Sequence, residues 1–394
     1  MEKIKLVKQK KVALFFPWIK SKGGAERALL EILDNSKHKI DVYTWIYDKE
    51  NSFEEFKKFK IHIVAPKIVR KLSKLNVLRG LFFPISLFSK IPLEKYDLFL
   101  IYTSGVGEFI TFRNFKPGKT YAYVNTPLRH ACKEIIDWNL ENTYKNPLSK
   151  STYLMAVKFY KVLEKIAWKK INKAIFISEL GLDRARRNDL INGKPTKVIY
   201  PSINLKRFDD IKPKKGDYFL YMSRFNAPKR QDLLIKAWKV FSKNHPYEKL
   251  ILAGHVENQK YFKKLNDLVK GVKNIVFKTN LNEEENLKLF SNCKAVISVH
   301  FMEDFGMTPF EALASGKPII AMDIGGYIEL LEKNPQFYKI KEVPSEKCLI
   351  QEINKSLEEF LKSKVVPKKI IFNELSTHNF INKFDEVLER HKNH

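Results

Sequence analysis

The chain has 394 residues, more than one hydrophobic core usually supports, so we expect two domains. Hydrophobic residues make up 44% of the chain, which excludes a disordered protein. The formal net charge is +28, and residues 1–200 carry 39 basic against 19 acidic residues, so the basic excess lies mainly in the first half. This asymmetry favours contact with an anionic surface or a polyanion, although a lysine-rich genome would produce the same total.

The cysteines indicate a reducing compartment. Cys132, Cys293 and Cys348 are odd in number and far apart, and no Cys-x-x-Cys pair suggests zinc or redox chemistry. The early apolar run at 12–19 is short and contains a proline, so we interpret it as a strand and not as a signal peptide. No run approaches the ~20 apolar residues that span a bilayer. We expect a cytoplasmic protein, with any membrane contact peripheral on the cytoplasmic face.

Short runs rich in Val, Ile, Phe and Tyr alternate with helical patterns along the chain, which indicates parallel sheets built from strand-helix-strand units. In the first half, strands are predicted at 12–18, 40–45, 61–65, 98–103, 121–125, 174–178 and 198–200. After a polar, proline-bearing bridge, the pattern repeats at 218–223, 250–253, 275–278, 295–300 and 318–322.

These strands predict an α/β protein with two Rossmann-like, doubly wound domains that face a central cleft. The first domain would span residues 1–200 and bind the acceptor, and the second would span 201–375 and bind the donor. Residues 376–394 carry apolar side chains at helical spacing, so we predict a terminal helix that packs across the domain junction.

Loops at the ends of predicted strands carry residues suited to binding an anion. Gly23 and Gly24 lie between the first strand and a helix, where adjacent glycines let a backbone approach a ligand closely. A plain turn explains these glycines equally well. Arg224 and Lys229 follow a strand of the second half, and both could reach one diphosphate. Solvated surface cations are the alternative.

A third loop carries Glu303 and Glu311, eight positions apart across a turn that opens a helix. Thr308, Pro309 and Glu311 have the pattern of an N-cap, a first-turn proline and a capping-box acid, so we predict a helix from Pro309. The two carboxylates would flank a sugar nucleotide whose diphosphate faces the helix start. Alternatively, Glu311 only closes the capping box and Glu303 is a solvated acid.

The order of these loops resembles the family-4 glycosyltransferases of the GT-B fold, which are retaining enzymes that use sugar nucleotides. The resemblance covers nearly the whole chain and is carried by Gly23–Glu26, Ile199–Asn204 with Arg207 and Phe208, Ser223–Arg224 with Lys229, and Glu303–Pro318. It implies a hexosyltransferase, with a lean to mannose, that moves sugar from a UDP- or GDP-sugar to a lipid-linked or polysaccharide acceptor. No Asp-x-Asp occurs, so we expect no metal and no cofactor.

The resemblance also implies roles for individual residues. Arg224 and Lys229 would neutralise the diphosphate as the glycosidic bond breaks, and Glu303 would bind hydroxyls of the donor sugar. Glu311 would hold the ribose hydroxyls. The other donor-binding residues it implies are Gly23, Gly24, Lys278, Phe305, Gly306, Met307 and Thr308. Of these, Lys278 departs from the glycine-bearing pattern that the family usually has near the nucleobase.

The segment Tyr123–His130 resembles a family segment that usually has the pattern His-Thr-Pro-x-Arg, found among members resembling mannosyltransferases. Asn125 stands where histidine is common, and asparagine can hydrogen-bond but cannot shuttle a proton near neutral pH. Arg129 matches the pattern and would contact donor or acceptor, or form a structural salt bridge. His130 would either compensate for Asn125 or be a buried imidazole.

The acceptor is expected against the basic first half. Residues 66–95 and 153–170 mix lysines with apolar side chains, which suits an anionic membrane surface, although either segment could instead cover its own sheet. Nucleic acid is not expected as a partner, because no recognition helix, RNP-type motif or zinc finger is present. Two rival functions remain, a sugar-nucleotide epimerase of the same fold and a non-enzymatic basic binding protein.

Overall fold

The structure is a computed structural model that describes residues 9–66, 82–127, 132–144, 146–212, 216–364 and 366–389. The chain divides into two compact units. Unit 1 comprises Met1–Ser202 with Thr377–His394, and unit 2 comprises Ile203–Ser376. The predicted helix after residue 376 forms, and it belongs to unit 1.

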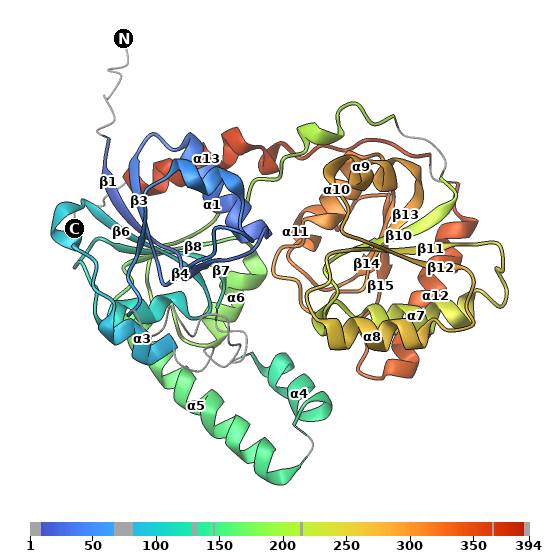
Figure 1. Ribbon diagram of the computed structural model, residues 1–394, viewed down its shortest axis with the longest axis horizontal. Helices are drawn as coiled ribbons and strands as arrows, with labels where there is room; N and C mark the ends of the chain where they lie inside the picture. The colour runs from blue at the N-terminus through green and yellow to red at the C-terminus, as the bar shows by residue number, and fades with distance from the viewer. Residues whose placement is uncertain are drawn as a thin grey trace. The chain divides into compact units, whose positions relative to one another are not determined.

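Unit 1 is built on a parallel sheet with the strand order β5-β3-β1-β6-β7-β8-β9 (Figure 1). The strands are β1 (Lys11–Phe15), β3 (Lys39–Thr44), β5 (Ile61–Ile63), β6 (Leu98–Ser104), β7 (Thr120–Thr126), β8 (Lys173–Phe176) and β9 (Thr196–Val198). A separate parallel pair is formed by β2 (Trp18–Ile19) and β4 (Ile46–Tyr47). Almost every side chain of β1 and β6 is buried, because the sheet is covered on both faces.

Two helices lie together on one face of this sheet, α1 (Gly24–Asn35) and α13 (Thr377–Glu389) (Figure 1). The other face carries α3 (Phe82–Phe88), α5 (Pro147–Lys169) and α6 (Glu179–Arg187), whose apolar side chains join the core of the sheet. α4 (Lys133–Asn142) lies beside the N-terminal part of α5, and this part of α5 projects from the unit (Figure 1).

Unit 2 repeats the architecture with the strand order β12-β11-β10-β13-β14-β15, again all parallel. Its strands are β10 (Tyr218–Met222), β11 (Leu250–Gly254), β12 (Ile275–Thr279), β13 (Cys293–Ser298), β14 (Ile319–Met322) and β15 (Phe337–Ile340). One face is covered by α7 (Gln231–Phe241), α8 (Gln259–Leu268) and α12 (Glu346–Lys362), and the other by α9 (Glu283–Asn292) and α10 (Thr308–Ala314) (Figure 1). A short helix, α11 (Ile328–Leu331), follows β14.

The predicted α/β class is confirmed by the two parallel, doubly wound sheets. All the predicted strands are present, and β15 and the β2–β4 pair come in addition. The predicted capping box is wrong, because α10 starts at Thr308 with Met307 as its N-cap, and no side chain caps it. Within the described ranges, no helix has an apolar stretch long enough to cross a bilayer.

Candidate functional site

Three neighbouring strands of unit 2 bring the predicted donor-binding residues together. β13 pairs with β10 on one side and with β14 on the other. Because parallel strands end at the same edge of a sheet, the loops after Met222, Ser298 and Met322 lie next to one another. A backbone hydrogen bond of 3.1 Å from Phe301 to Pro228 joins the first two loops. Another of 3.1 Å, from Gly326 to the carbonyl of Glu303, joins the second and third.

Glu303 is the centre of this loop cluster. Its Oε2 atom accepts a hydrogen bond from Lys229 Nζ at 2.6 Å and lies 3.3 Å from Nδ1 of His300. Both side chains of the Lys229–Glu303 pair are largely buried. Lys229 ends the 3-10 turn Ala227–Lys229 after β10, and His300 follows β13. The predicted residues Lys229 and Glu303 are therefore in direct contact, and His300 was not singled out from the sequence.

The charges in this cluster follow from burial and from the lysine. Burial alone would raise the pKa of Glu303, but Lys229 and His300 reverse this and lower it well below its ordinary value. Burial lowers the pKa of His300 to about 4, and Lys229 acts in the same direction against the opposing effect of Glu303. At neutral pH His300 is therefore a neutral ring whose Nδ1–H donates to an ionised Glu303.

The loop around Glu303 has a backbone that needs glycine. Gly306 has φ of +83°, and a Cβ atom there would lie 2.7 Å from the ring of Tyr327 and 3.1 Å from Cγ of Glu303. Met302, just before Glu303, also has a positive φ, of 51°, which a non-glycine residue adopts only at a cost. The predicted residues Phe305, Gly306, Met307 and Thr308 all belong to this segment, which leads directly into α10.

The two arginines after β10 have different environments. Arg224 is more than half exposed, and its Nη1 lies 3.3 Å from Oε2 of Glu257. Arg230, which adopts a left-handed backbone conformation, is largely buried and donates two hydrogen bonds to Glu342, of 3.0 and 3.1 Å. Arg230 therefore fixes the loop, whereas the exposed guanidinium of Arg224 is accessible to a ligand.

Glu311 has a different hydrogen-bond partner from those of Glu303. Its Oε1 accepts a hydrogen bond from Nη2 of Arg207, and Nη1 of the same arginine lies 2.7 Å from Oε1 of Glu283. Burial raises the pKa of Glu311, and Arg207 opposes this. Arg207 was noted in the sequence only as part of the family pattern, and the structure identifies it as the partner of this carboxylate.

Lys278 lies on β12, the edge strand of unit 2, and is exposed. β11 and β10 separate it from β13 in the sheet. The structure therefore does not bring Lys278 into the cluster of loops around Glu303.

Unit 1 has its own group of strand-end loops, after β1, β6 and β7, which are neighbours in the sheet. Gly23 is the N-cap of α1 and Gly24 is its first residue, and a Cβ on Gly23 would lie 2.6 Å from Oε2 of Glu26. Asn125 donates a hydrogen bond of 3.3 Å to Oγ of Ser104. Arg129 and His130 lie outside the described residues.

Next to Asn125, the loop after β6 contains a buried acid that the sequence analysis did not identify. Glu108 is fully buried, and its Oε2 accepts a hydrogen bond from the hydroxyl of Thr103. The same hydroxyl accepts bonds from the backbone N–H groups of Gly105 and Gly107, at 3.1 and 3.0 Å. Burial raises the pKa of Glu108 to about 7, so this carboxyl holds its proton far more strongly than an ordinary glutamate.

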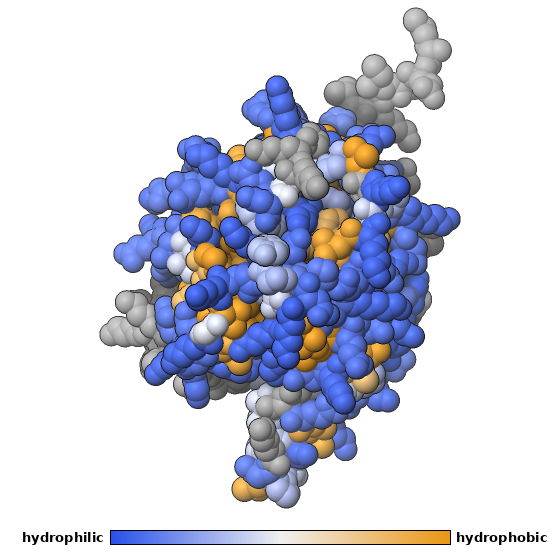
Figure 2. Space-filling model, turned by 90° about the vertical axis from the view of Figure 1, so that its right-hand side faces the viewer, coloured by the Kyte–Doolittle hydropathy of each residue, from blue (hydrophilic) through white to orange (hydrophobic). Residues whose placement is uncertain are grey.

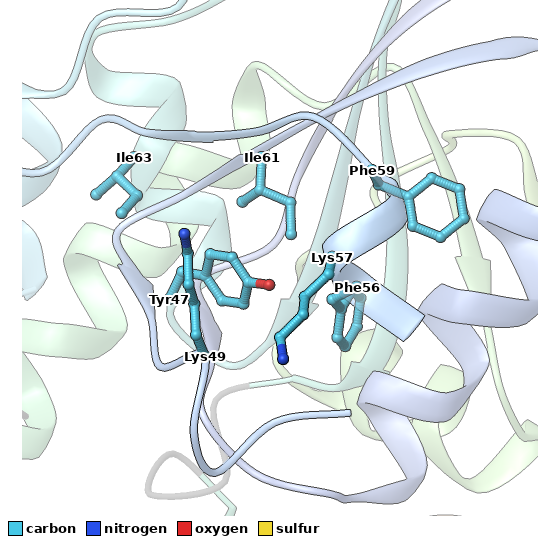
Figure 3. Close-up of a pocket in the computed structure, with 7 residues that line it drawn as sticks. All are labelled: Tyr47, Lys49, Phe56, Lys57, Phe59, Ile61 and Ile63. Carbon is cyan, nitrogen blue, oxygen red and sulfur yellow. The ribbon is translucent and has the colours of Figure 1, made fainter. Parts of the chain in front are cut away.

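A pocket of about 260 Å³ opens elsewhere on unit 1, beside the β2–β4 pair (Figure 3). Figure 3 shows aromatic and isoleucine side chains around it together with the ammonium groups of two lysines; the lining residues are Tyr47, Lys49, Phe56, Lys57, Phe59, Ile61 and Ile63. None of the predicted site residues lines this pocket. Lys57 is already paired with Glu54 at 2.6 Å.

In the part of the chain that the structure describes, no group of three or more His, Cys, Asp or Glu side chains is arranged to hold a metal ion. The three cysteines are free thiols; Cys132 and Cys293 are buried and Cys348 is exposed.

Comparison with known proteins gives matches to one class of enzyme. Residues 202–374 match the family described as "Glycosyl transferases group 1". The alpha-1,3/1,6-mannosyltransferase ALG2 of Kluyveromyces lactis is 25% identical over 376 residues, covering 82% of this chain and 71% of that protein. ALG2 of Dictyostelium discoideum is 24% identical, covering 87% of this chain and 88% of that protein.

Solved structures agree on the fold over the full length. Anabaena Alr3699/HepE, solved in complex with UDP and glucose, superposes with a TM-score of 0.63 at 18% identity, covering 96% of this chain and 99% of that chain. WaaG, a glycosyltransferase involved in lipopolysaccharide biosynthesis, superposes with a TM-score of 0.56 at 14% identity, covering 95% of each chain. Both likenesses concern the fold alone.

These matches confirm the resemblance to glycosyltransferases of the GT-B fold that was drawn from the sequence. The protein has the GT-B fold of glycosyltransferases, and its residues 202–374 match glycosyl transferases group 1. It is accordingly an enzyme that takes a sugar from a nucleotide-sugar donor and passes it to a glycan acceptor.

Proposed function

We propose that the protein transfers mannose, with retention of configuration and without a metal ion or cofactor, from a UDP- or GDP-activated donor. The acceptor is a lipid-linked or polysaccharide glycan at the cytoplasmic face of an anionic membrane. The choice of mannose is supported by the relatives named alpha-1,3/1,6-mannosyltransferase, and by the O-antigen chain mannosyltransferase RfbU of Salmonella typhimurium, which is 27% identical over 176 residues.

The observation that carries the proposal is the Glu303 cluster at the carboxyl end of β13. Lys229 and His300 both bind Oε2 of Glu303, and the pKa of this acid is well below its ordinary value. An ionised carboxylate held from one side is an acceptor for sugar hydroxyls, each of which can donate a hydrogen bond. Glu303 is therefore suited to orient the hexose of the donor.

The same lysine serves the leaving group. An ammonium group has three N–H donors, so Lys229 can keep its bond to Glu303 and still donate to a phosphate oxygen. When the bond between the anomeric carbon and the diphosphate oxygen breaks, its electron pair and negative charge go to the diphosphate. Lys229 and the accessible guanidinium of Arg224 stabilise that charge, a contribution that typically amounts to a factor of about 10² to 10³ in turnover for one donor.

Retention requires that the acceptor hydroxyl attack from the face that the diphosphate leaves. In this arrangement the departing diphosphate can take the acceptor's proton, so the site needs no separate carboxylate base. Catalysis then comes from positioning and from the fixed positive charges. We assign Glu311 to the ribose hydroxyls as a hydrogen-bond acceptor, and Nη2 of Arg207 binds its Oε1 atom.

The test is transfer by the purified full chain from GDP-mannose and from other UDP- and GDP-sugars to a lipid-linked glycan in detergent, with the product's anomeric configuration read by NMR. Glu303→Gln and Arg224→Ala are expected to lower kcat by about 10²-fold and at least tenfold, respectively. Glu346→Gln is the control, because Glu346 forms an exposed pair with Lys236 on α7 and touches no predicted site residue.

Several results would contradict parts of the proposal. Full activity of Glu303→Gln would refute the role of the cluster, and an inverted product would refute retention. Loss of activity with EDTA that added metal restores would refute metal independence. Isomerisation of the donor without any acceptor would establish the epimerase instead.

A further inference from the structure

The long helix α5 of unit 1 exposes a row of apolar side chains along its length. Leu148, Met155, Phe159, Val162 and Ile166 are 79, 62, 54, 52 and 40% exposed. At 3.6 residues per turn, their positions fall within an arc of about 60° on the helix surface. The row extends for about 27 Å along the axis at 1.5 Å per residue. The sequence left open whether this segment covers its own sheet, and these side chains do not.

The opposite side of α5 packs against the rest of unit 1. Leu163 and Ala167 pack with Phe109, and the buried Trp168 joins the core of unit 1. Tyr153 stacks on Tyr144 beside α4, with ring centroids 4.3 Å apart. These contacts use one side of the helix. The apolar row lies on the other side, outside the face that packs within unit 1.

A row of lysines runs next to the apolar row. Lys150, Lys158, Lys161, Lys165 and Lys169 fall within an adjacent arc of about 100°, by the same helical spacing. Of these, Lys165 lies 3.0 Å from Asp189 across an exposed salt bridge. The only acidic residue of α5 is Glu164, which is buried, so the exposed side of the helix carries no negative charge of its own.

The helix is also positioned to meet a large surface. Its C-terminal end is fixed by two hydrogen bonds. Lys194 donates one of 2.6 Å to the carbonyl of Trp168, and Thr111 donates one of 3.2 Å to the carbonyl of Ala167. Its N-terminal part projects from unit 1 together with α4 (Figure 1). Figure 2 shows apolar side chains exposed on this projecting arm, at the bottom of the view.

We propose that this side of α5, the α5 face, docks the enzyme onto an anionic membrane surface. The inference deepens the proposed function, since it rests on an acceptor held in a membrane. A helix with an apolar row beside a basic row lies in the plane of the interface, with the apolar side chains among the acyl chains and the lysines at the anionic head groups. A second copy of this chain would bring two basic rows together, so charge favours the lipid surface over self-association.

Vesicle co-sedimentation of the full chain tests the proposal. Wild-type protein is expected to bind vesicles of phosphatidylcholine with about 30 mol% phosphatidylglycerol, and to bind pure phosphatidylcholine at least tenfold more weakly. Leu148→Ser with Met155→Ser and Val162→Ser should weaken binding to the anionic vesicles at least tenfold. The matched control makes the same kind of change at three exposed apolar residues of unit 2, Val240, Tyr247 and Val366, and should leave binding unchanged.

A second variant tests the basic row separately. Wild-type binding to anionic vesicles should weaken as salt rises, and Lys158→Glu with Lys161→Glu and Lys169→Glu should abolish it. Lys243→Glu, an exposed lysine of unit 2, is the control. Both triple variants should retain transfer to a detergent-solubilised acceptor, because the substituted side chains are exposed and none of them belongs to the Glu303 cluster.

Three results would overturn the inference. The first is that the wild-type protein fails to bind anionic vesicles, and the second is that the triple variants bind them as tightly as the wild type. The third is that the wild type forms a dimer in solution and the serine variant is a monomer. Transfer in detergent without vesicle binding would refute docking and leave the proposed function intact. Vesicle binding through α5 without any sugar transfer would support docking and refute the proposed function.

Discussion

Unit 1 and unit 2 each place a glutamate in the loop after a central strand, and the pKa values of the two acids are shifted in opposite directions. Glu108 follows β6 and accepts a hydrogen bond from the hydroxyl of Thr103, and burial raises its pKa to about 7. Glu303 follows β13 beside Lys229, and its pKa is well below the ordinary value. Of these two buried carboxyls, the one with a lysine within hydrogen-bond reach has the lowered pKa.

Removing the cation should have the largest effect. Lys229→Met removes the cation beside Glu303 and leaves it with His300, so the pKa of its carboxyl should rise and the leaving diphosphate should lose a donor. We expect kcat to fall by about 10² to 10³-fold in steady-state assays. The unfolding free energy should drop by about 1 to 3 kcal/mol in urea titrations, because a largely buried charge loses its partner.

Lys236→Met is the control for this variant, since Lys236 pairs with Glu346 in an exposed position on the same helix that follows the loop. Equal loss of activity in both variants would show that the cation beside Glu303 has no special role.

Glu108→Gln should remove a pH dependence of stability. Because the folded pKa is about 7 and the ordinary value 4.5, folded protein holds a proton that unfolded protein has lost between these values. The unfolding free energy of the wild type should therefore fall as pH rises from 4.5 to 7, by up to about 3 kcal/mol, and change little above pH 7 from this group. Urea midpoints at pH 5, 6, 7 and 8 would show this slope reduced in Glu108→Gln. An unchanged slope would mean that Glu108 is ionised in the folded protein.

His300 should give a slope of the opposite sign. Its folded pKa is about 4 against an ordinary 6.5, so unfolded protein binds a proton in this range that folded protein does not. Stability should fall as pH drops from 6.5 to 4, by about 2 to 3 kcal/mol for this group. His300→Phe should flatten that acid limb in urea titrations, with His245→Phe, a half-exposed histidine of the same unit, as the control. A steeper acid limb in His300→Phe would contradict the assignment of a neutral ring.

Arg207→Ala tests Glu311, a buried acid that has a cation beside it, like Glu303, but a raised pKa, like Glu108. Glu311 is buried beside an arginine, yet its pKa is raised, because burial outweighs the opposing effect of Arg207. Removing the guanidinium should make Glu311 resemble Glu108 and cost about 1 to 2 kcal/mol of stability. If Glu311 binds ribose, the KM for the donor should rise about tenfold with little change in kcat. A lower kcat with unchanged KM would place Glu311 at the reacting bond instead.

The smallest effect is expected for Lys57→Ala in the pocket of unit 1. Lys57 forms an exposed salt bridge with Glu54, and pairs of this kind contribute little to stability. Donor KM, kcat and the urea midpoint should all match the wild type within error. A change in KM for the acceptor alone would assign this pocket to acceptor binding.

The sequence predicted the strands well because each central strand is a run of mostly apolar residues between polar segments, as at Leu98–Ser104. β15 was not predicted, since its four residues, Phe337–Ile340, include a lysine and lie close to charged residues on both sides. The two-residue strands β2 and β4 are too short to leave a pattern.

The candidate site was harder to predict where partners are distant in sequence. The Lys229–Glu303 contact joins residues 74 positions apart, and only the order of strands in the sheet brings them together. The capping-box prediction failed because a local pattern competed with Arg207, which is 104 positions from Glu311. His300 offered no signal of its own, because a single histidine after an apolar strand is equally typical of a core residue.

The return of α13 to unit 1 has a consequence for how the protein is made. Asp385 accepts hydrogen bonds from the hydroxyl of Ser36, at 2.6 Å, and from the backbone of Lys37, at 3.0 Å. The ribosome therefore releases all of Ile203–Ser376 before it delivers the helix that covers α1. The part of the chain that is synthesised first is completed last, and until then it exposes the apolar surface that Phe380 and Phe384 will cover.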